Sequence, residues 1–251
     1  MSDIDILWED ANYLAISKPA GLASIPGRGE KVSAFEQVAK KVGLPHRGQT
    51  DPRLRLVHRI DKDTSGILLF AKNRTAQKHV SHQFQNNQVN KEYLALVAGR
   101  PETDEGEIDA PIARHSSSRQ KMAVSKQGRP ARTFWKVEEH LGPFTLLRVY
   151  PKTGKTHQIR VHLNSIGLPL AIDPLYNSKA SQQILLSSFK RGYRKSGEQE
   201  RPLIQRLTLH AQKLAFKKLD GTTVALIAPL PRDLRATIAQ LRRFGGFLTS
   251  R

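Results

Sequence analysis

The chain has 251 residues, of which 38% are hydrophobic and 25% charged, a composition that supports a packed core and argues against gross disorder. A formal net charge of +19 is typical of a protein with a negatively charged partner, with nucleic acid first and an anionic membrane second. Cysteine is absent, which excludes disulfides, thiolate zinc sites, iron–sulfur clusters and a cysteine nucleophile.

The N-terminal segment carries no recognisable targeting signal. Its acidic start, "MSDIDILWED", fits neither a transit peptide nor a basic membrane anchor. The chain also lacks an apolar run of the roughly 18 residues that a membrane-spanning helix needs. We therefore expect a soluble cytoplasmic protein without a membrane partner.

The first predicted elements are short strands over residues 4–8 and 13–17, followed by a loop rich in proline and glycine. The segment "SAFEQVAKKVG" (33–43) predicts a short helix. Ser33 and Glu36 have the spacing of a capping box, which satisfies backbone donors at a helix start.

The middle of the chain predicts mainly strands. "GILLFAK" (66–72) is apolar enough to be a buried strand, and residues 74–89 have the apolar spacing of a helix. "KEYLALVAG" (91–99) alternates like a strand. Further short strands are predicted over residues 106–113, 121–126, 131–140 and 144–151.

The C-terminal third adds two helices and a hairpin. "KTHQIRVHLNSIG" (155–167) predicts a helix, and residues 177–206 predict a basic surface insertion rich in Ser, Gln, Lys and Arg. Residues 209–218 and 222–230 predict a hairpin, because an Asp-Gly turn lies between them. Residues 231–245 predict an amphipathic closing helix.

Strands outnumber helices and often follow one another directly. This pattern favours an α+β fold, with a mostly antiparallel mixed sheet and flanking helices, over a doubly wound parallel sheet. Neither an internal repeat nor a linker is visible, so we expect one domain over residues 1–251, with residues 177–206 as its basic insertion.

One acidic segment stands out in this basic chain. "HRIDKDTSG" (58–66) places Asp61 and Asp63 among His58, Arg59 and Lys62. Such a segment is either an ordinary surface turn or the site of a reactive carboxylate beside a polyanion. A cation within a few ångströms lowers a carboxylate pKa by about 1–3 units and would keep it ionised. The sequence alone does not choose between Asp61 and Asp63.

Two other segments carry candidate functional side chains. "KTHQIRVH" holds a dense set of donors, either as a basic helix on phosphates or with one arginine directed at an acid in a cleft. Tyr93, in an alternating strand, is either a sheet residue or a flat face for stacking a base. No carboxylate lies at a ligand-like offset beside the histidine pairs 79/82 or 157/162, so we expect no metal site.

These segments together resemble the RluA-type family of RNA pseudouridine synthases. The resemblance rests on "LVHRIDKDTSGILLFAK" (56–72), "NKEYLALVAG" (90–99) and "TGKTHQIRVHLNSIGLPLAIDPLY" (153–176). "ISKPAGL" (16–22) and "LHAQKLAF" (209–216) also fit in order. The resemblance implies the pseudouridine synthase catalytic-domain fold with a central active-site cleft. Many relatives carry a small RNA-binding domain ahead of it, which we do not expect here.

The resemblance also implies an activity, the isomerisation of specific uridines to pseudouridine in structured RNA, either rRNA or tRNA, without cofactor or metal. By position, Asp61 is the catalytic aspartate, Tyr93 the active-site tyrosine and Arg160 the aspartate-pairing arginine. Asp61 acts as a nucleophile or as a base, and the resemblance leaves both open. The expected RNA-binding residues are Arg59, His58, Lys155, His157, Gln158 and Lys18, in a protein expected to be monomeric.

Two rival functions remain open at this point. A non-catalytic RNA-binding protein would explain the positive charge without a reactive carboxylate. A metal-dependent nuclease would cleave RNA and would be blocked by a chelator.

Overall fold

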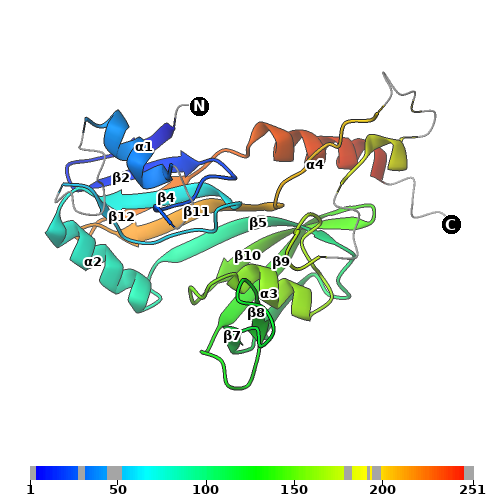
Figure 1. The fold of residues 1–251 in the computed structure, drawn as a ribbon, viewed down its shortest axis with the longest axis horizontal. Coiled ribbons are helices and arrows are strands. Elements are labelled where there is room, and N and C mark those ends of the chain that lie inside the picture. The colour runs from blue at the N-terminus through cyan, green and yellow to red at the C-terminus, as the bar shows by residue number, and fades with distance from the viewer. Residues whose placement is uncertain are drawn as a thin grey trace. The chain divides into compact units, whose positions relative to one another are not determined.

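The structure is a computed structural model that describes residues 4–27, 32–43, 53–177, 183–190, 193 and 199–245. The chain forms two compact units. The first unit comprises Met1–Tyr93 and His210–Pro229, and the second unit comprises Leu94–Leu209 and Leu230–Arg251. Strand β5 (Asn90–Ala98) begins in the first unit and continues into the second (Figure 1).

The first unit is built on a mixed sheet. Its central strand is β4, which pairs antiparallel with β2 from Gly66 to Ala71 and antiparallel with β3 at its C-terminal end. At its N-terminal end β4 pairs parallel with β11 through His210↔Ser65 and Ala211↔Gly66. The strands of this unit are β1 (Asp5–Glu9), β2 (Tyr13–Lys18), β3 (Arg55–Leu56), β4 (Ser65–Ala71), β11 (Leu209–Lys217) and β12 (Thr223–Ile227). Strand β11 belongs to this unit from His210 onward.

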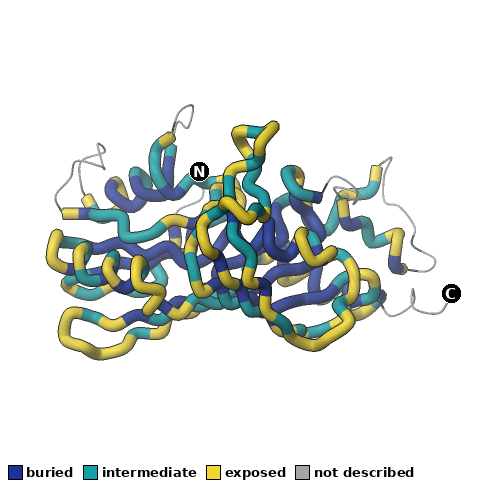
Figure 2. The backbone as a smooth tube through the Cα atoms, turned by 90° about the horizontal axis from the view of Figure 1, so that it is seen from below, coloured by how far each residue is buried: buried dark blue, intermediate teal, exposed yellow. Residues whose placement is uncertain are grey.

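Helices cover both faces of this sheet. Successive residues of a strand point to opposite faces, and in β2 they enter different cores. Tyr13 packs with residues of α2 (Arg74–Gln85), whereas Leu14 packs with residues of α1 (Ala34–Lys41). Every residue of β4 is buried because helices lie on both of its faces. Figure 2 colours buried residues dark blue and exposed residues yellow, and many of the exposed residues lie in turns.

The predicted capping box of α1 is confirmed. The Ser33 hydroxyl accepts from the backbone N–H of Glu36 at 3.3 Å, and the Glu36 carboxylate accepts from the backbone N–H of Ser33 at 2.8 Å. Two helix-terminal donors are thereby satisfied by side chains. This local signal was readable because all its members lie within four residues.

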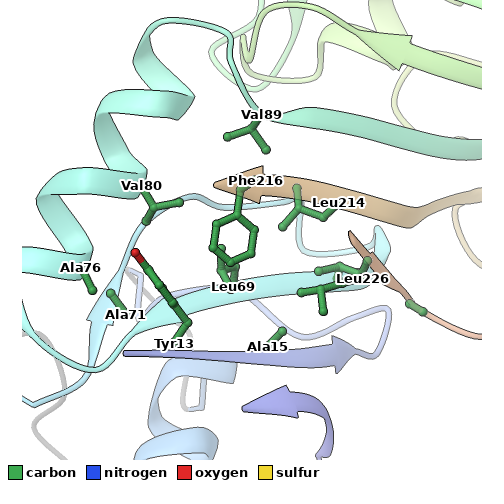
Figure 3. Packing of buried hydrophobic residues seen from close by; sticks show 12 residues of the cluster. Tyr13, Ala15, Leu69, Ala71, Ala76, Val80, Val89, Leu214, Phe216 and Leu226 are labelled. Atoms are coloured by element: carbon green, nitrogen blue, oxygen red, sulfur yellow. The ribbon is translucent and has the colours of Figure 1, made fainter. Parts of the chain in front are cut away.

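The core between the first unit's sheet and α2 contains one unpartnered polar atom among the described residues, the Tyr13 hydroxyl. Figure 3 shows the Tyr13 ring beside Phe216 with its hydroxyl directed toward α2. The two rings meet edge to face at 5.2 Å. Burial, and next the charges of Asp10 and Asp220, raise the pKa of Tyr13 to about 12.

The second unit contains a larger antiparallel arrangement. In it β9 pairs with both β6 and β10, and β7 and β8 form a separate two-stranded sheet. The strands are β6 (Glu105–Asp109), β7 (Ile112–Arg114), β8 (Met122–Val124), β9 (Arg132–Leu141) and β10 (Phe144–Pro151). The helices are α3 (Gln158–Ser165), the 3-10 helix η1 (Leu186–Ser188) and α4 (Arg232–Phe244).

The second unit buries the apolar face of α4, as its sequence predicts. Leu234, Ile238 and Leu241 are each at most 4% exposed and join the core that contains Leu94 and Leu96 of β5. The α+β class with a mixed, mostly antiparallel sheet is therefore confirmed, since only β4 and β11 pair parallel among the strand pairs described here.

Residues 177–206 differ from the predicted surface insertion. In their described part, Ile184, Phe189 and Ile204 are buried in the core of the second unit. Apolar side chains at long spacing within a polar stretch give no periodic signal, so composition alone misclassified them. Residues 178–182, 191–192 and 194–198 lie outside the described residues.

Candidate active site

The segment 58–66 forms the loop between β3 and the start of β4 in the first unit. Asp61 is half-buried, whereas Asp63 is exposed. The backbone N–H of Thr64 donates to the Asp61 carbonyl at 3.2 Å and closes a turn. Burial therefore distinguishes the two acids that the sequence left equivalent, and Asp61 is the better-shielded carboxylate.

Tyr93 lies in the same unit and within electrostatic range of Asp61. Burial, and next the negative charge of Asp61, raise the pKa of Tyr93 above its ordinary value. The phenol consequently stays protonated at neutral pH and can donate a hydrogen bond. The structure thus brings together two of the three residues predicted to be catalytic.

His58 supports the loop from inside the first unit. Its Nε2 accepts from the backbone N–H of Leu69 at 3.0 Å, and its ring stacks on Phe84 at 4.6 Å. Burial, and next the charge of Lys91, lower the pKa of His58 to about 3. A neutral imidazole is required, because a protonated Nε2 could not accept this bond. His58 thus has a structural role in the loop, and its predicted RNA contact stays a prediction.

Lys18, another residue of the predicted RNA-binding set, has internal partners. Its side chain is fully buried, and its ammonium donates to the carbonyls of Pro19, Leu22 and Lys62 at 2.7–2.8 Å. Three carbonyls satisfy the three donors of an ammonium. Lys18 thus ties the end of β2 to the loop that carries Asp61, and its RNA contact stays a prediction.

In the second unit, Arg160 is held by a carboxylate that the sequence reading had not singled out. Its Nε and Nη2 donate to the two oxygens of Asp173, both at 2.8 Å, and the pair is buried. The guanidinium lies 4.9 Å from the centre of the Tyr176 ring. This fork-to-fork geometry fixes the plane of the guanidinium more firmly than a single bond would.

Asp173 and Tyr176 also order the surrounding chain. One Asp173 oxygen accepts from the backbone N–H groups of Leu175 and Tyr176, at 3.0 and 3.2 Å. The Tyr176 hydroxyl accepts from the Met122 N–H and contacts His157 Nδ1, both at 2.8 Å. His157 has a left-handed backbone, with φ 55°. Its predicted RNA contact stays a prediction.

Gln158 also has internal partners. It is 4% exposed, and its amide makes four hydrogen bonds inside the second unit. The oxygen accepts from the Thr153 hydroxyl and the Lys155 N–H, and the nitrogen donates to the Arg132 carbonyl and the Thr133 hydroxyl. All four hydrogen-bonding positions of the amide are used, so Gln158 anchors the start of α3, and its RNA contact stays a prediction.

Arg59 and Lys155 remain available for the predicted RNA contacts. Arg59 is exposed and Lys155 is half-buried. Their positions, two residues before Asp61 and five before Arg160, place a positive charge near each candidate catalytic side chain along the chain. RNA contact by these residues stays a prediction.

Asp173 could have been found from its sequence context. It is an acid flanked by apolar residues in "LAIDPLY", and a buried carboxylate is rare unless it is paired. A buried carboxylate therefore predicts a cationic partner, and in the structure that partner is Arg160. Ser24, which hydrogen-bonds the backbone of Ile60 beside Asp61, carried no such signal. A serine among small residues is common in loops.

The described part of the chain contains no group of three or more His, Cys, Asp or Glu residues placed to hold a metal ion. Within the same residues, no helix is long and apolar enough to cross a membrane. The predictions of a metal-free and cofactor-free reaction stay predictions.

Comparison with known proteins decides the family. A profile described as RNA pseudouridylate synthase matches residues 12–165. The chain belongs to the RNA pseudouridylate synthase family. This membership confirms the resemblance to the RluA-type family that the sequence motifs indicated. The matched residues include the Asp61 loop, β5 with Tyr93, and Arg160.

Curated relatives extend the match over nearly the whole chain. A ribosomal large subunit pseudouridine synthase D from Nitrosomonas europaea is 39% identical over 95% of this chain, which spans 65% of that relative's length. An uncharacterized RNA pseudouridine synthase from Bacillus subtilis is 37% identical over 97% of this chain and 74% of its own.

A solved structure of the same family has a similar fold. The human RNA pseudouridylate synthase domain containing 4 matches 95% of this chain and 93% of its own, with a TM-score of 0.72 and 28% identity. The family fold predicted from the motifs is therefore confirmed.

Proposed function

We propose that this protein is an RNA pseudouridine synthase that isomerises uridine in a structured RNA. Large-subunit ribosomal RNA is the first candidate substrate, because relatives that cover 95% of this chain carry that specificity in their names. The observation that carries the proposal is the half-buried carboxylate of Asp61 within electrostatic range of the half-buried Tyr93 phenol, in a family whose members share this activity.

The reaction is an isomerisation in which no atom is gained or lost. The bond between the uracil nitrogen and the ribose breaks, the uracil turns, and a carbon–carbon bond forms to the same ribose carbon. We assign the ribose chemistry to Asp61, as the nucleophile or as the base that removes a proton next to the reacting carbon. A carboxylate serves either role only when ionised.

Tyr93 supplies a flat face and a hydrogen-bond donor. Its raised pKa keeps the phenol protonated at neutral pH, so little phenolate is available as a base, which favours stacking on the uracil over proton removal from it. Stacking of a base on an aromatic ring is worth about 1–3 kcal/mol. That stabilisation offsets part of the few kcal/mol needed to extrude a base from folded RNA.

Arg160 is the proposed partner that keeps the catalytic aspartate ionised, a role taken from the family resemblance. The support within the second unit is its fixed orientation, because Asp173 holds two guanidinium nitrogens and Tyr176 covers one face. Arg59, Lys155 and His157 are the proposed RNA contacts. We further propose a cytoplasmic, monomeric protein with a single catalytic domain and no cofactor.

The test uses two acids in one loop. Purified protein is incubated with a large-subunit rRNA transcript, and pseudouridine is mapped by chemical labelling and mass spectrometry. Asp61→Asn should abolish product while RNA affinity stays unchanged. Asp63→Asn, two residues away and exposed, is the control and should keep full activity.

The same experiment separates the rival functions. A nuclease would shorten the RNA and lose activity with a chelator, whereas an isomerase leaves RNA length unchanged. RNA binding without product in the wild-type protein, on both ribosomal and transfer RNA, would leave a non-catalytic binding protein as the remaining function.

A further inference from the structure

The two residues on either side of Asp61 are held by side chains from one segment of the first unit. Ser24 contacts Ile60, which precedes Asp61, and Lys18 contacts Lys62, which follows it. The segment 18–24 comprises the last residue of β2 and the loop after it, and it is more than thirty residues away from Ile60 and Lys62 in sequence.

Ser24 makes an unusual pair of contacts for one hydroxyl. Its Oγ donates to the Ile60 carbonyl at 2.8 Å and accepts from the Ile60 N–H at 3.3 Å. Ser24 is 5% exposed and Ile60 is 8% exposed. Both backbone groups of Ile60 are thus satisfied away from water by a single side chain, and losing it would leave two buried polar groups unpaired.

Ser24 is itself fixed by the start of α1. The Ala34 N–H donates to the Ala23 carbonyl at 2.8 Å, and the Phe35 N–H donates to the Ser24 carbonyl at 3.2 Å. These are first-turn helix donors, which have no partner inside the helix. The connection therefore runs from a rigid helix through Ser24 to Ile60 and so to the backbone of Asp61.

The other side of Asp61 is held as well. The buried ammonium of Lys18 joins the Lys62 carbonyl to the carbonyl of Leu22 in the same segment. The Thr64 N–H then bonds the carbonyl of Asp61 itself. With the peptides before and after it restrained, Asp61 has little freedom in its backbone dihedrals.

We propose that Ser24 is a positioning residue that sets the placement of Asp61 for the reaction. The inference rests on the proposed function of Asp61. Ser24 does not touch substrate, and its effect is transmitted through Ile60. Misplacement of a catalytic group by about 1 Å can cost about 10²-fold in rate, so a rigid clamp at this place has a kinetic consequence.

The test compares Ser24→Ala with Ser24→Thr, in which the hydroxyl is kept. Single-turnover rates at saturating rRNA transcript and dissociation constants for the same RNA are measured on the full chain. Ser24→Ala should lower the rate by about 10- to 10²-fold with unchanged RNA affinity. Ser24→Thr should recover most of that rate.

A matched control variant removes an equivalent pair of hydrogen bonds made by one buried hydroxyl in the second unit. In the second unit the buried Thr208 hydroxyl donates to the Leu96 carbonyl at 2.8 Å and accepts from the Ile172 N–H at 3.2 Å. Thr208→Val should lower the melting temperature and leave the rate per folded molecule unchanged. Equal rates for Ser24→Ala and Thr208→Val would overturn the proposal.

A measurement on the wild-type protein makes the proposal testable even when Ser24→Ala does not fold. The Ile60 amide should exchange slowly with deuterium, because it is buried and bonded to Ser24. Exchange as fast as that of an exposed loop amide would contradict the clamp. Inactive wild-type protein with a protected Ile60 amide would instead refute the proposed function.

Discussion

Arg160 and Asp173, thirteen residues apart, form a buried two-point ion pair in which Nε and Nη2 each donate at 2.8 Å. A second pair in the same unit has the same form: Arg206 Nε and Nη2 donate to Asp233 at 2.7 and 2.8 Å. The two pairs differ in burial, with the Asp173 side chain 1% exposed and the Asp233 side chain 42% exposed. The buried pair contains the candidate catalytic arginine, Arg160, and the more exposed pair provides a matched control in the same unit.

The first prediction uses this pairing. Arg160→Lys should reduce pseudouridine formation by about 10²-fold, because an ammonium cannot reproduce a guanidinium fork. Arg206→Lys makes the same exchange at the second pair and should leave the rate unchanged. Both rates are measured at saturating RNA and corrected for the folded fraction. Similar losses in both variants would show that the effect is general to the unit and unrelated to catalysis.

The second prediction concerns acid stability. His58 is neutral when folded, with its pKa lowered to about 3, so the unfolded chain binds one more proton than the folded chain below the ordinary histidine pKa. The stability contributed by this site is therefore present above about pH 6.5 and is lost progressively as the pH falls toward 3.

His58→Gln tests this dependence, because the glutamine oxygen can still accept from the Leu69 N–H but does not titrate. The free energy of unfolding is measured by urea denaturation between pH 7 and pH 4. The free energy of unfolding of the wild-type protein should fall more steeply with decreasing pH than that of the variant. The difference in slope should correspond to the uptake of up to about one proton on unfolding. Parallel curves would show that His58 is not the group responsible.

The third prediction concerns the Tyr13 hydroxyl, which is buried without a partner. Tyr13→Phe should raise the free energy of unfolding by about 1 kcal/mol, since it removes an unsatisfied polar group and keeps the ring packed on Phe216. Tyr176→Phe is the opposite case, because its hydroxyl bonds Met122 and His157, and should destabilise. Chemical denaturation of both variants gives the sign, and destabilisation by Tyr13→Phe would contradict the prediction.

The fourth prediction concerns the closing glycine of the 58–66 segment. Gly66 has φ +117°, and a Cβ there would lie 2.2 Å from the Ala211 carbonyl oxygen, where β4 and β11 run parallel. Gly66→Ala should cost at least about 3 kcal/mol of stability. Gly154→Ala, with no atom within 4 Å of its Cβ, should change stability little. Thermal unfolding distinguishes them, and a stable Gly66→Ala protein would show that the strands can separate.

Much of the secondary structure was predictable because its signals are local. Ser33 and Glu36 formed the capping box their spacing indicated, and the Asp-Gly turn at residues 220–221 joined β11 to β12. The apolar residues of 177–206 were misread because their burial depends on the core that receives them. The internal hydrogen bonds of Gln158 and Lys18 were not predictable for the same reason, since a polar side chain in sequence shows nothing of its partners in the fold.

Sequence alone determined the α+β class, the basic character of the surface and, through three motifs, the family and the short set of residues that includes Asp61, Tyr93 and Arg160. Tertiary structure decided that Asp61 rather than Asp63 is shielded, that Ser24 bonds the backbone of Ile60, and that Asp173 pairs with Arg160. The physical reason is distance along the chain. Helix caps and strand alternation act within a few residues, whereas Ser24 meets Ile60 across 36 residues, a pairing that only folding creates.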